Sequence, residues 1–179
     1  MSALVIGVGN DFRRDDGIGP AVAAEIARRG LLGVKVQTAA GDPTELLDAW
    51  NGVALCVIVD AAVGDGAEPG RMRRWSPGDW RADSAVSSHT LDVPATYALG
   101  EALGRLPRKL LVVTVDAADI GHGIGLSPAL ADAVPVVTAA VLAEIDSSAG
   151  FPTSDLRREL PVSLRRGPVP RRTRRADIR

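Results

Sequence analysis

Several residue types are scarce in this chain of 179 residues, and each scarcity excludes a class of protein. The single cysteine, Cys56, excludes an internal disulfide and a cysteine-rich zinc site. Aromatic residues make up only 3% of the chain, so the core must be built from aliphatic side chains. No uninterrupted apolar run reaches the roughly 18 residues that span a bilayer, so we expect no membrane association. The first residues lack the basic region of a secretory signal, which predicts a cytoplasmic protein.

The length and the apolar share of 46% predict one folded domain rather than two. The net charge of −1 conceals a basic C-terminal segment, since residues 151–179 hold nine arginines against three acidic residues. That segment has four prolines and almost no apolar periodicity. We therefore expect a domain over residues 1–147 and a disordered tail over residues 148–179, of which residues 151–179 should be dispensable for folding. The tail has no interleaved aromatics to stack bases, so we expect that it does not bind nucleic acid. We also expect the protein to be a monomer.

Three apolar runs predict strands that are buried on both faces, at residues 3–8, 53–59 and 110–115. Two shorter segments, residues 34–38 and 71–75, are expected to be edge strands. Helical spacing predicts helices from Gly19, over 43–51, over 91–103 with Val93, Tyr97 and Leu99 toward the core, and from Ser127–Pro128 to about Ile145 with a bend at Pro135. This alternation predicts a single-domain α/β fold. The expected architecture is a three-layer sandwich with about five mostly parallel strands in a twisted sheet and helices on both faces.

Polar residues follow the predicted buried strands, where ligands bind in sheets of this kind. Asp15 and Asp16 come after the first strand, Asp60 ends the central one, and Asp116 ends the last. Each has a structural interpretation when taken alone, because an aspartate commonly forms a turn, caps a helix or complements a helix N-terminus. Together with His89, however, two of these carboxylates provide the oxygen and nitrogen ligands that bind a divalent first-row metal.

Other kinds of chemistry find less support in the sequence. Cys56 lies within an apolar run, where a thiol is inert. Ser88 adjoins His89, but neighbouring residues rarely point at each other, and no nucleophile elbow is present. The Gly7–Gly9 turn lacks the third glycine of the dinucleotide-binding fingerprint.

Four motifs resemble those of the endopeptidases that mature the large subunit of nickel–iron hydrogenases. They are the opening motif, Ile6–Asn10 with Arg14–Pro20, then Val57–Ala61, Ser87–His89 and Gly125–Pro128. The resemblance covers about residues 3–146 and implies a five-stranded sheet with helices on both faces. It also implies that Asp16, Asp60 and His89 are the catalytic and metal-binding residues. Family members carry Glu or Asp at the first position, and Asp16 has the shorter reach.

The resemblance implies a metal-dependent endopeptidase that removes the C-terminal extension of a hydrogenase large-subunit precursor. In this interpretation nickel is supplied by the precursor, and it either polarises the scissile carbonyl or lowers the pKa of a bound water. The segment Gly41–Leu47 departs from the family's usual acidic–Gly–Thr turn, which leaves open which hydrogenase is processed.

Three alternatives remain open at this point. Asp116 and His122 form a second candidate pair at the same edge, although glycines flank His122 and indicate a mobile loop. A non-catalytic, nickel-sensing maturation chaperone would need the same ligands as the protease. A peptidyl-tRNA-hydrolase-like enzyme would explain the turn at Gly9–Asn10, but the histidine expected soon after that turn is missing.

Overall fold

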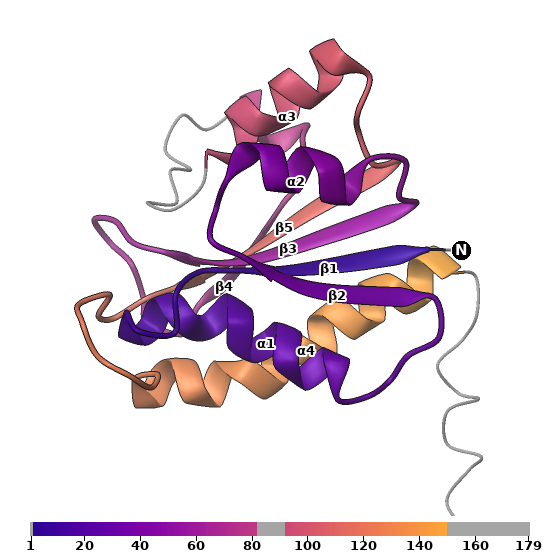
Figure 1. Ribbon diagram of the computed structural model, residues 1–179. Coiled ribbons are helices and arrows are strands. Elements are labelled where there is room, and N and C mark those ends of the chain that lie inside the picture. Colours follow the sequence, from indigo (N-terminus) through magenta and orange to yellow (C-terminus); the bar gives the residue numbers. More distant parts are fainter. Residues whose placement is uncertain (1, 82–91, 150–179) are drawn as a thin grey trace, which may run out of the picture.

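One five-stranded sheet forms the centre of the structure, a computed structural model that describes residues 2–81 and 92–149. The strands lie in the order β2-β1-β3-β5-β4 (Figure 1). Four of them are parallel, namely β1 (Ala3–Val8), β2 (Val34–Ala39), β3 (Leu55–Ala62) and β5 (Lys109–Asp116). The fifth, β4 (Met72–Trp75), pairs antiparallel with β5 at one edge. The two edge strands are therefore those that the sequence predicted.

Helices cover both faces of this sheet (Figure 1). Helices α1 (Ile18–Ala27) and α4 (Pro128–Ala149) lie on one face, and α2 (Pro43–Trp50) and α3 (Val93–Leu103) lie on the other. Two short 3₁₀ turns, η1 (Arg14–Gly17) and η2 (Asp79–Arg81), complete the described elements. The predicted fold class, a three-layer α/β sandwich with a mostly parallel sheet, is confirmed.

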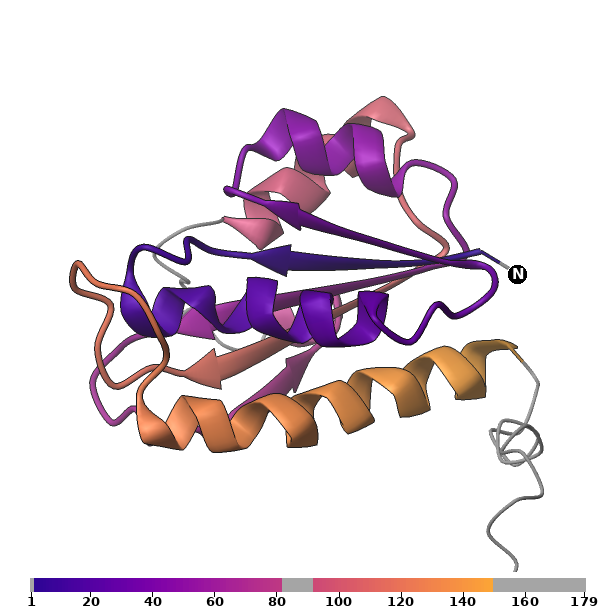
Figure 2. The ribbon, with the colours of Figure 1, turned by 60° about the horizontal axis from the view of Figure 1, so that its bottom comes forward.

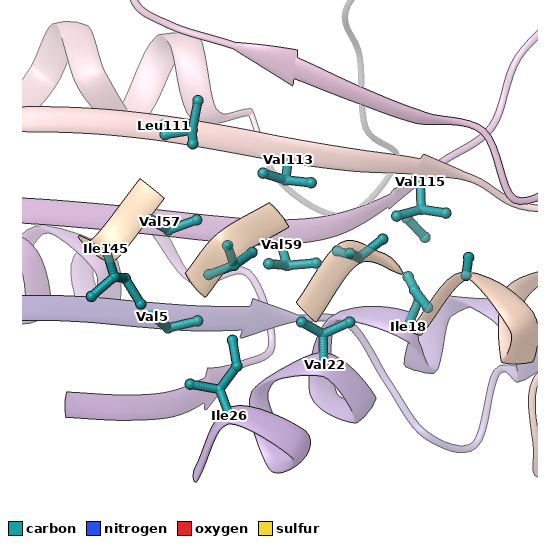
Figure 3. Packing of buried hydrophobic residues seen from close by; sticks show 14 of the residues in the cluster. Val5, Ile18, Val22, Ile26, Val57, Val59, Leu111, Val113, Val115 and Ile145 are labelled. Carbon is teal, nitrogen blue, oxygen red and sulfur yellow. The ribbon is translucent and has the colours of Figure 1, made fainter. Parts of the chain in front are cut away.

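Two aliphatic clusters, one on each face, hold the layers together. The alternation of side chains along β3 sends Val57 and Val59 toward α1 and α4, whereas Cys56 and Ile58 face α2 and α3. Figure 3 shows the first cluster, in which valines of the three central strands pack against α1 and α4. Burying each such side chain contributes about 1.5–3 kcal/mol to folding. The sheet is thus fixed on both faces, as the continuous apolar runs predicted.

A contact between two glycines allows α1 to lie directly on the sheet. A Cβ added at Gly7 would lie 2.3 Å from the carbonyl oxygen of Gly19, and one added at Gly19 would lie 2.5 Å from that of Val59. No side chain other than hydrogen fits at either position. The glycines of the opening motif therefore serve close packing of a helix on β1 and β3, and they set the beginning of α1 at the carboxyl ends of these strands.

Three local expectations were wrong or incomplete. Leu99 was expected in the core but is 45% exposed, because the buried side of α3 is formed by Val93, Thr96 and Gly100. Strand β3 continues through Asp60 to Ala62, so Asp60 lies inside the strand. Helix α4 continues to Ala149, past its expected end and past the expected domain boundary. The first two residues of the predicted tail, 148 and 149, thus belong to this helix, and the rest of it, residues 150–179, lies outside the described residues.

Helix α4 also qualifies the expectation about membranes. Its segment Pro128–Ser148 has a mean hydropathy of 1.6 and is long and apolar enough to cross a membrane by length and composition. A search for uninterrupted apolar runs missed it, because Asp132 and Glu144 interrupt the sequence. One side of the helix packs in the first cluster, where the side chains of Leu130, Val137 and Val141 are buried, and about a third of the apolar segment is buried in all.

Candidate active site

The turn after β1 places Asp16 beyond the carboxyl end of that strand. Gly9 has a φ of +136°, and a Cβ there would lie 1.9 Å from the carbonyl oxygen of Asp16, so the chain closes tightly only with glycine. The backbone N–H of Asn10 donates to Oδ2 of Asp16 over 3.0 Å. The Asp16 side chain is 3% exposed. One backbone donor thus fixes a nearly buried carboxylate at the edge of the sheet.

Asp60 lies on the neighbouring strand at the same edge. It is fully buried, and Oδ1 accepts a 2.9 Å hydrogen bond from the backbone N–H of Ala61. Because Gly7 of β1 pairs with Val59 of β3, Asp60 comes level with Val8, the last residue of β1. The turn η1 packs against β3 as well as against α1. The structure therefore brings Asp16 and Asp60 to the carboxyl ends of two adjacent strands.

The third predicted site residue, His89, lies outside the described residues, as do Ser87 and Ser88. Along β3, Asp60 falls on the same face as Cys56 and Ile58, which is the face covered by α3. Helix α3 begins at Val93, four residues after His89 in the sequence, and Val93 is buried in the second cluster. Within residues 2–81 and 92–149, no group of three or more His, Cys, Asp or Glu side chains is arranged to hold a metal ion. The three-residue site therefore stays a prediction.

Asp15 belongs to a structural clamp rather than to the candidate site. Its carboxylate is fully buried and accepts four hydrogen bonds, from the N–H groups of Ala118, Asp119 and Ser127 and from the Ser127 hydroxyl, at 2.6–3.0 Å. Burial alone would raise the pKa of Asp15, but these hydrogen bonds outweigh it and lower the pKa below its ordinary value. The interpretation of Asp15 as a mere complement to a helix N-terminus missed this role.

Asp116 is also engaged in structure. Its Oδ2 accepts from Nη2 of Arg73 at 2.8 Å and from the backbone N–H of Glu68 at 3.0 Å. These bonds tie the loop before β4 to the end of β5. His122 is exposed, and only its backbone carbonyl takes part in a described contact, with Nε of Arg14 at 3.3 Å. Of the second candidate pair, Asp116 thus has a structural explanation, whereas the described contacts of His122 involve only its backbone.

Nucleophilic catalysis by the thiol finds no support in the structure. Cys56 is buried in the middle of β3, and burial raises the pKa of its thiol to about 12. The thiolate, which is the reactive form, is therefore absent at neutral pH.

A cleft of about 290 Å³ borders the turn that carries Asp16. It is lined by Gly9, Asp11, Pro20, Thr38, Ala39, Ala40 and Glu45. Ala40 precedes the segment Gly41–Leu47, and Glu45 belongs to it. Asp42 in that segment caps α2 by accepting from the N–H of Thr44 over 2.7 Å. The segment therefore contributes Glu45 to the wall of a cleft beside the candidate site.

Comparisons with known proteins agree with this architecture. A protein-family model described as hydrogenase maturation protease matches residues 21–144. The hydrogenase 2 maturation protease of Escherichia coli K12 is 28% identical over 152 residues, which cover 83% of this chain and 93% of that protein.

Solved structures show the same fold. The hydrogenase maturating endopeptidase HybD from E. coli superposes with a TM-score of 0.69 at 26% identity, covering 87% of this chain and 99% of the other. The NiFe hydrogenase maturation protease HybD from Thermococcus kodakarensis has a TM-score of 0.63 at 24% identity, covering 80% of this chain and 99% of the other.

Proposed function

The chain belongs to the hydrogenase maturation protease family, and from that membership we propose that it removes the C-terminal extension of a hydrogenase large-subunit precursor that already carries nickel. The membership makes the chain an endopeptidase that processes a hydrogenase precursor. The requirement for nickel and the residues that act on it are the proposed part. The observation that carries the proposal is the pair of buried carboxylates, Asp16 and Asp60, at the ends of two adjacent central strands.

In the proposed reaction the nickel ion is part of the substrate. Asp16, Asp60 and His89 add oxygen and nitrogen ligands to an ion that the precursor already holds, and nickel accepts such a mixed shell. The ion then polarises the scissile carbonyl or activates a water, and one of the two carboxylates relays a proton. A precursor without nickel brings no Lewis acid, so the protein would leave it intact. This dependence would protect other proteins from cleavage.

The geometry supports a pair of carboxylates that are held in place by different elements of the fold. The backbone N–H groups of Asn10 and Ala61 each hold one oxygen atom in place, at 3.0 Å and 2.9 Å. Asp16 lies on a turn that follows β1, whereas Asp60 lies within β3, so they approach a bound group from different elements. Rigid carboxylates of this kind need little reorganisation when they meet a charged ligand.

The test is a mass measurement on two forms of the precursor. Purified protein is incubated with nickel-loaded and with nickel-free precursor, and the masses of the products are read. We expect the wild type to remove the extension from the nickel-loaded form only. We expect no cleavage of that form by the His89→Ala variant. The matched histidine control is His122→Ala, which should still cleave the loaded form at saturating precursor. Efficient cleavage of the nickel-free precursor, or a wild-type rate for His89→Ala, would contradict the proposal.

A further inference from the structure

Two loops at the carboxyl edge of the sheet are joined into one unit, which we name the loop pair (residues 10–17 and 117–127). Figure 2 shows the orange loop before α4 lying beside the indigo turn that leads into α1. The backbone N–H of Gly123 donates to the carbonyl of Phe12 over 2.9 Å, and that of Arg14 donates to the carbonyl of Gly123 over 3.0 Å. The buried Asp15 carboxylate adds its four hydrogen bonds to the same loop.

The loop pair presents two large apolar side chains to solvent. Phe12 is 70% exposed and Ile124 is 83% exposed. Their backbones are close in space, because Ile124 directly follows Gly123, whose N–H donates to the carbonyl of Phe12. The loops that carry them are fixed, since Oδ1 of Asn10 also accepts from the N–H of Phe12 over 2.9 Å. The exposure is therefore a property of an ordered surface.

Three charged groups of the loop pair are engaged within it. Arg14 and Asp119 form an ion pair at 3.1 Å, and Asp15 is buried in its clamp. Beside these charged groups, the surface offers a partner two large, exposed apolar side chains, Phe12 and Ile124. A fixed apolar surface binds with a smaller entropy cost than a flexible one, and burial of such side chains is the main source of affinity at protein interfaces.

The position of the loop pair indicates which partner covers it. Phe12 lies two residues after Asn10, whose N–H holds the carboxylate of Asp16. A protein chain with its scissile bond at Asp16 and Asp60 must pass this edge of the sheet. We propose that Phe12 and Ile124 form an apolar docking ridge for the folded part of the hydrogenase large-subunit precursor. This inference rests on the proposed function for the identity of the partner.

The test compares two double variants of the full chain in a binding assay that needs no turnover. Phe12→Ser with Ile124→Ser removes the ridge, and both residues are exposed enough to leave the core intact. Leu32→Ser with Val136→Ser is the matched control, since these side chains are 100% and 61% exposed outside the loop pair. We expect the Kd for nickel-loaded precursor to rise about tenfold in the ridge variant, the range for truncated interface anchors, and to stay within about twofold in the control.

Cleavage and self-association are measured on the same samples. A rise in KM larger than the fall in kcat would support the ridge as a docking surface. If the ridge variant binds the precursor with an unchanged Kd and the wild type cleaves it, the docking ridge is overturned and the proposed function stands. If binding of the precursor depends on the ridge but the wild type does not cleave it, the proposed function is overturned and the docking ridge stands. A wild-type dimer that the ridge variant converts to monomer, with Kd for the precursor unchanged, would assign the ridge to a second copy of the chain and overturn the proposal.

Discussion

The two ends of the sheet differ in the buried groups that they contain. At the carboxyl edge the structure buries four carboxylates, those of Asp15, Asp16, Asp60 and Asp116. At the amino edge a small cavity of about 50 Å³ is lined without any charged residue, by Ser2, Ala3, Leu32, Gly33, Val34, Leu55, Ile145 and Ser148. Burying an ionised carboxylate costs several kcal/mol unless hydrogen bonds or ions compensate it. Burial of carboxylates at the carboxyl edge therefore costs folding free energy, which indicates that these groups have a structural or a functional role.

The four carboxylates at the carboxyl edge divide into two kinds. Asp15 and Asp116 each connect distant loops, through the clamp to Ser127 and through the ion pair with Arg73. The contacts of Asp16 and Asp60 include N–H groups that are close in the sequence, those of Asn10 and Ala61. Neighbours in the sequence, Asp15 and Asp16, thus serve different purposes. The following predictions test that division, beginning with the largest effect.

Replacing either candidate catalytic carboxylate should remove activity without harming the fold. Asp16→Asn and Asp60→Asn keep the shape and one acceptor oxygen but lose the charge that meets the metal-loaded substrate. We expect the rate of precursor cleavage to fall at least about 100-fold, with a melting temperature equal to or above that of the wild type. Cleavage assays and thermal melts of the same preparations check this. A variant that melts far below the wild type would show that its carboxylate is structural.

Replacing Asp15 should have the opposite profile. Asp15→Ala leaves the N–H groups of Ala118, Asp119 and Ser127 without their acceptor inside the protein. We expect the free energy of unfolding to fall by about 2–4 kcal/mol. Denaturant unfolding measures it, and Asp15→Asn, which retains one acceptor oxygen, should lose less. Equal stability of Asp15→Ala and the wild type would show that the clamp contributes nothing.

The clamp should also make stability depend on pH in acid. The pKa of Asp15 is lowered in the folded protein, so the unfolded chain binds this proton more readily. Its contribution is complete above the ordinary aspartate pKa and is lost as the pH falls below about 4. The stability difference between the wild type and Asp15→Asn should therefore shrink as the pH is lowered from 6 toward 3 in denaturant titrations. A difference that grows in acid would mean that the pKa is raised instead.

The amino edge should be the tolerant end of the molecule. Helix α4 ends there at Ala149, and the expected tail follows it in the sequence. Removing residues 150–179 should shift the melting temperature by no more than a degree or two, which is less than about 1 kcal/mol for a domain of this size. A fall of ten degrees in a thermal melt would show that the tail packs on the domain.

The elements of the fold could be predicted because their signals are local. Three uninterrupted apolar runs predicted β1, β3 and β5, since a strand covered by helices on both faces has no polar side. The exposed position of Leu99 was not predicted, because two helical faces of α3 are equally apolar in sequence and only packing against the sheet selects one. The fold class followed from the order of elements alone.

The candidate site was predictable only in part. The carboxyl ends of the central strands located Asp15, Asp16, Asp60 and Asp116, and His89 was added as the nitrogen ligand. Motif resemblance then selected Asp16, Asp60 and His89 from this set, and the role of His89 stays a prediction. The clamp was not predictable, because the partners of Asp15 lie 103 to 112 residues away in the sequence. A pattern within a short window cannot contain such a pairing. The same reason hid the pairing of Phe12 with the loop that carries Ile124.

The most direct test of the account compares Asp60→Asn with Asp116→Asn, two buried aspartates at the same edge of the sheet and on neighbouring strands. Nickel-loaded precursor is incubated with each folded variant, and the mass of the large subunit is measured over time. The account predicts that Asp116→Asn releases the extension and that Asp60→Asn leaves the precursor at full mass. Release of the extension by Asp60→Asn at the wild-type rate would contradict it.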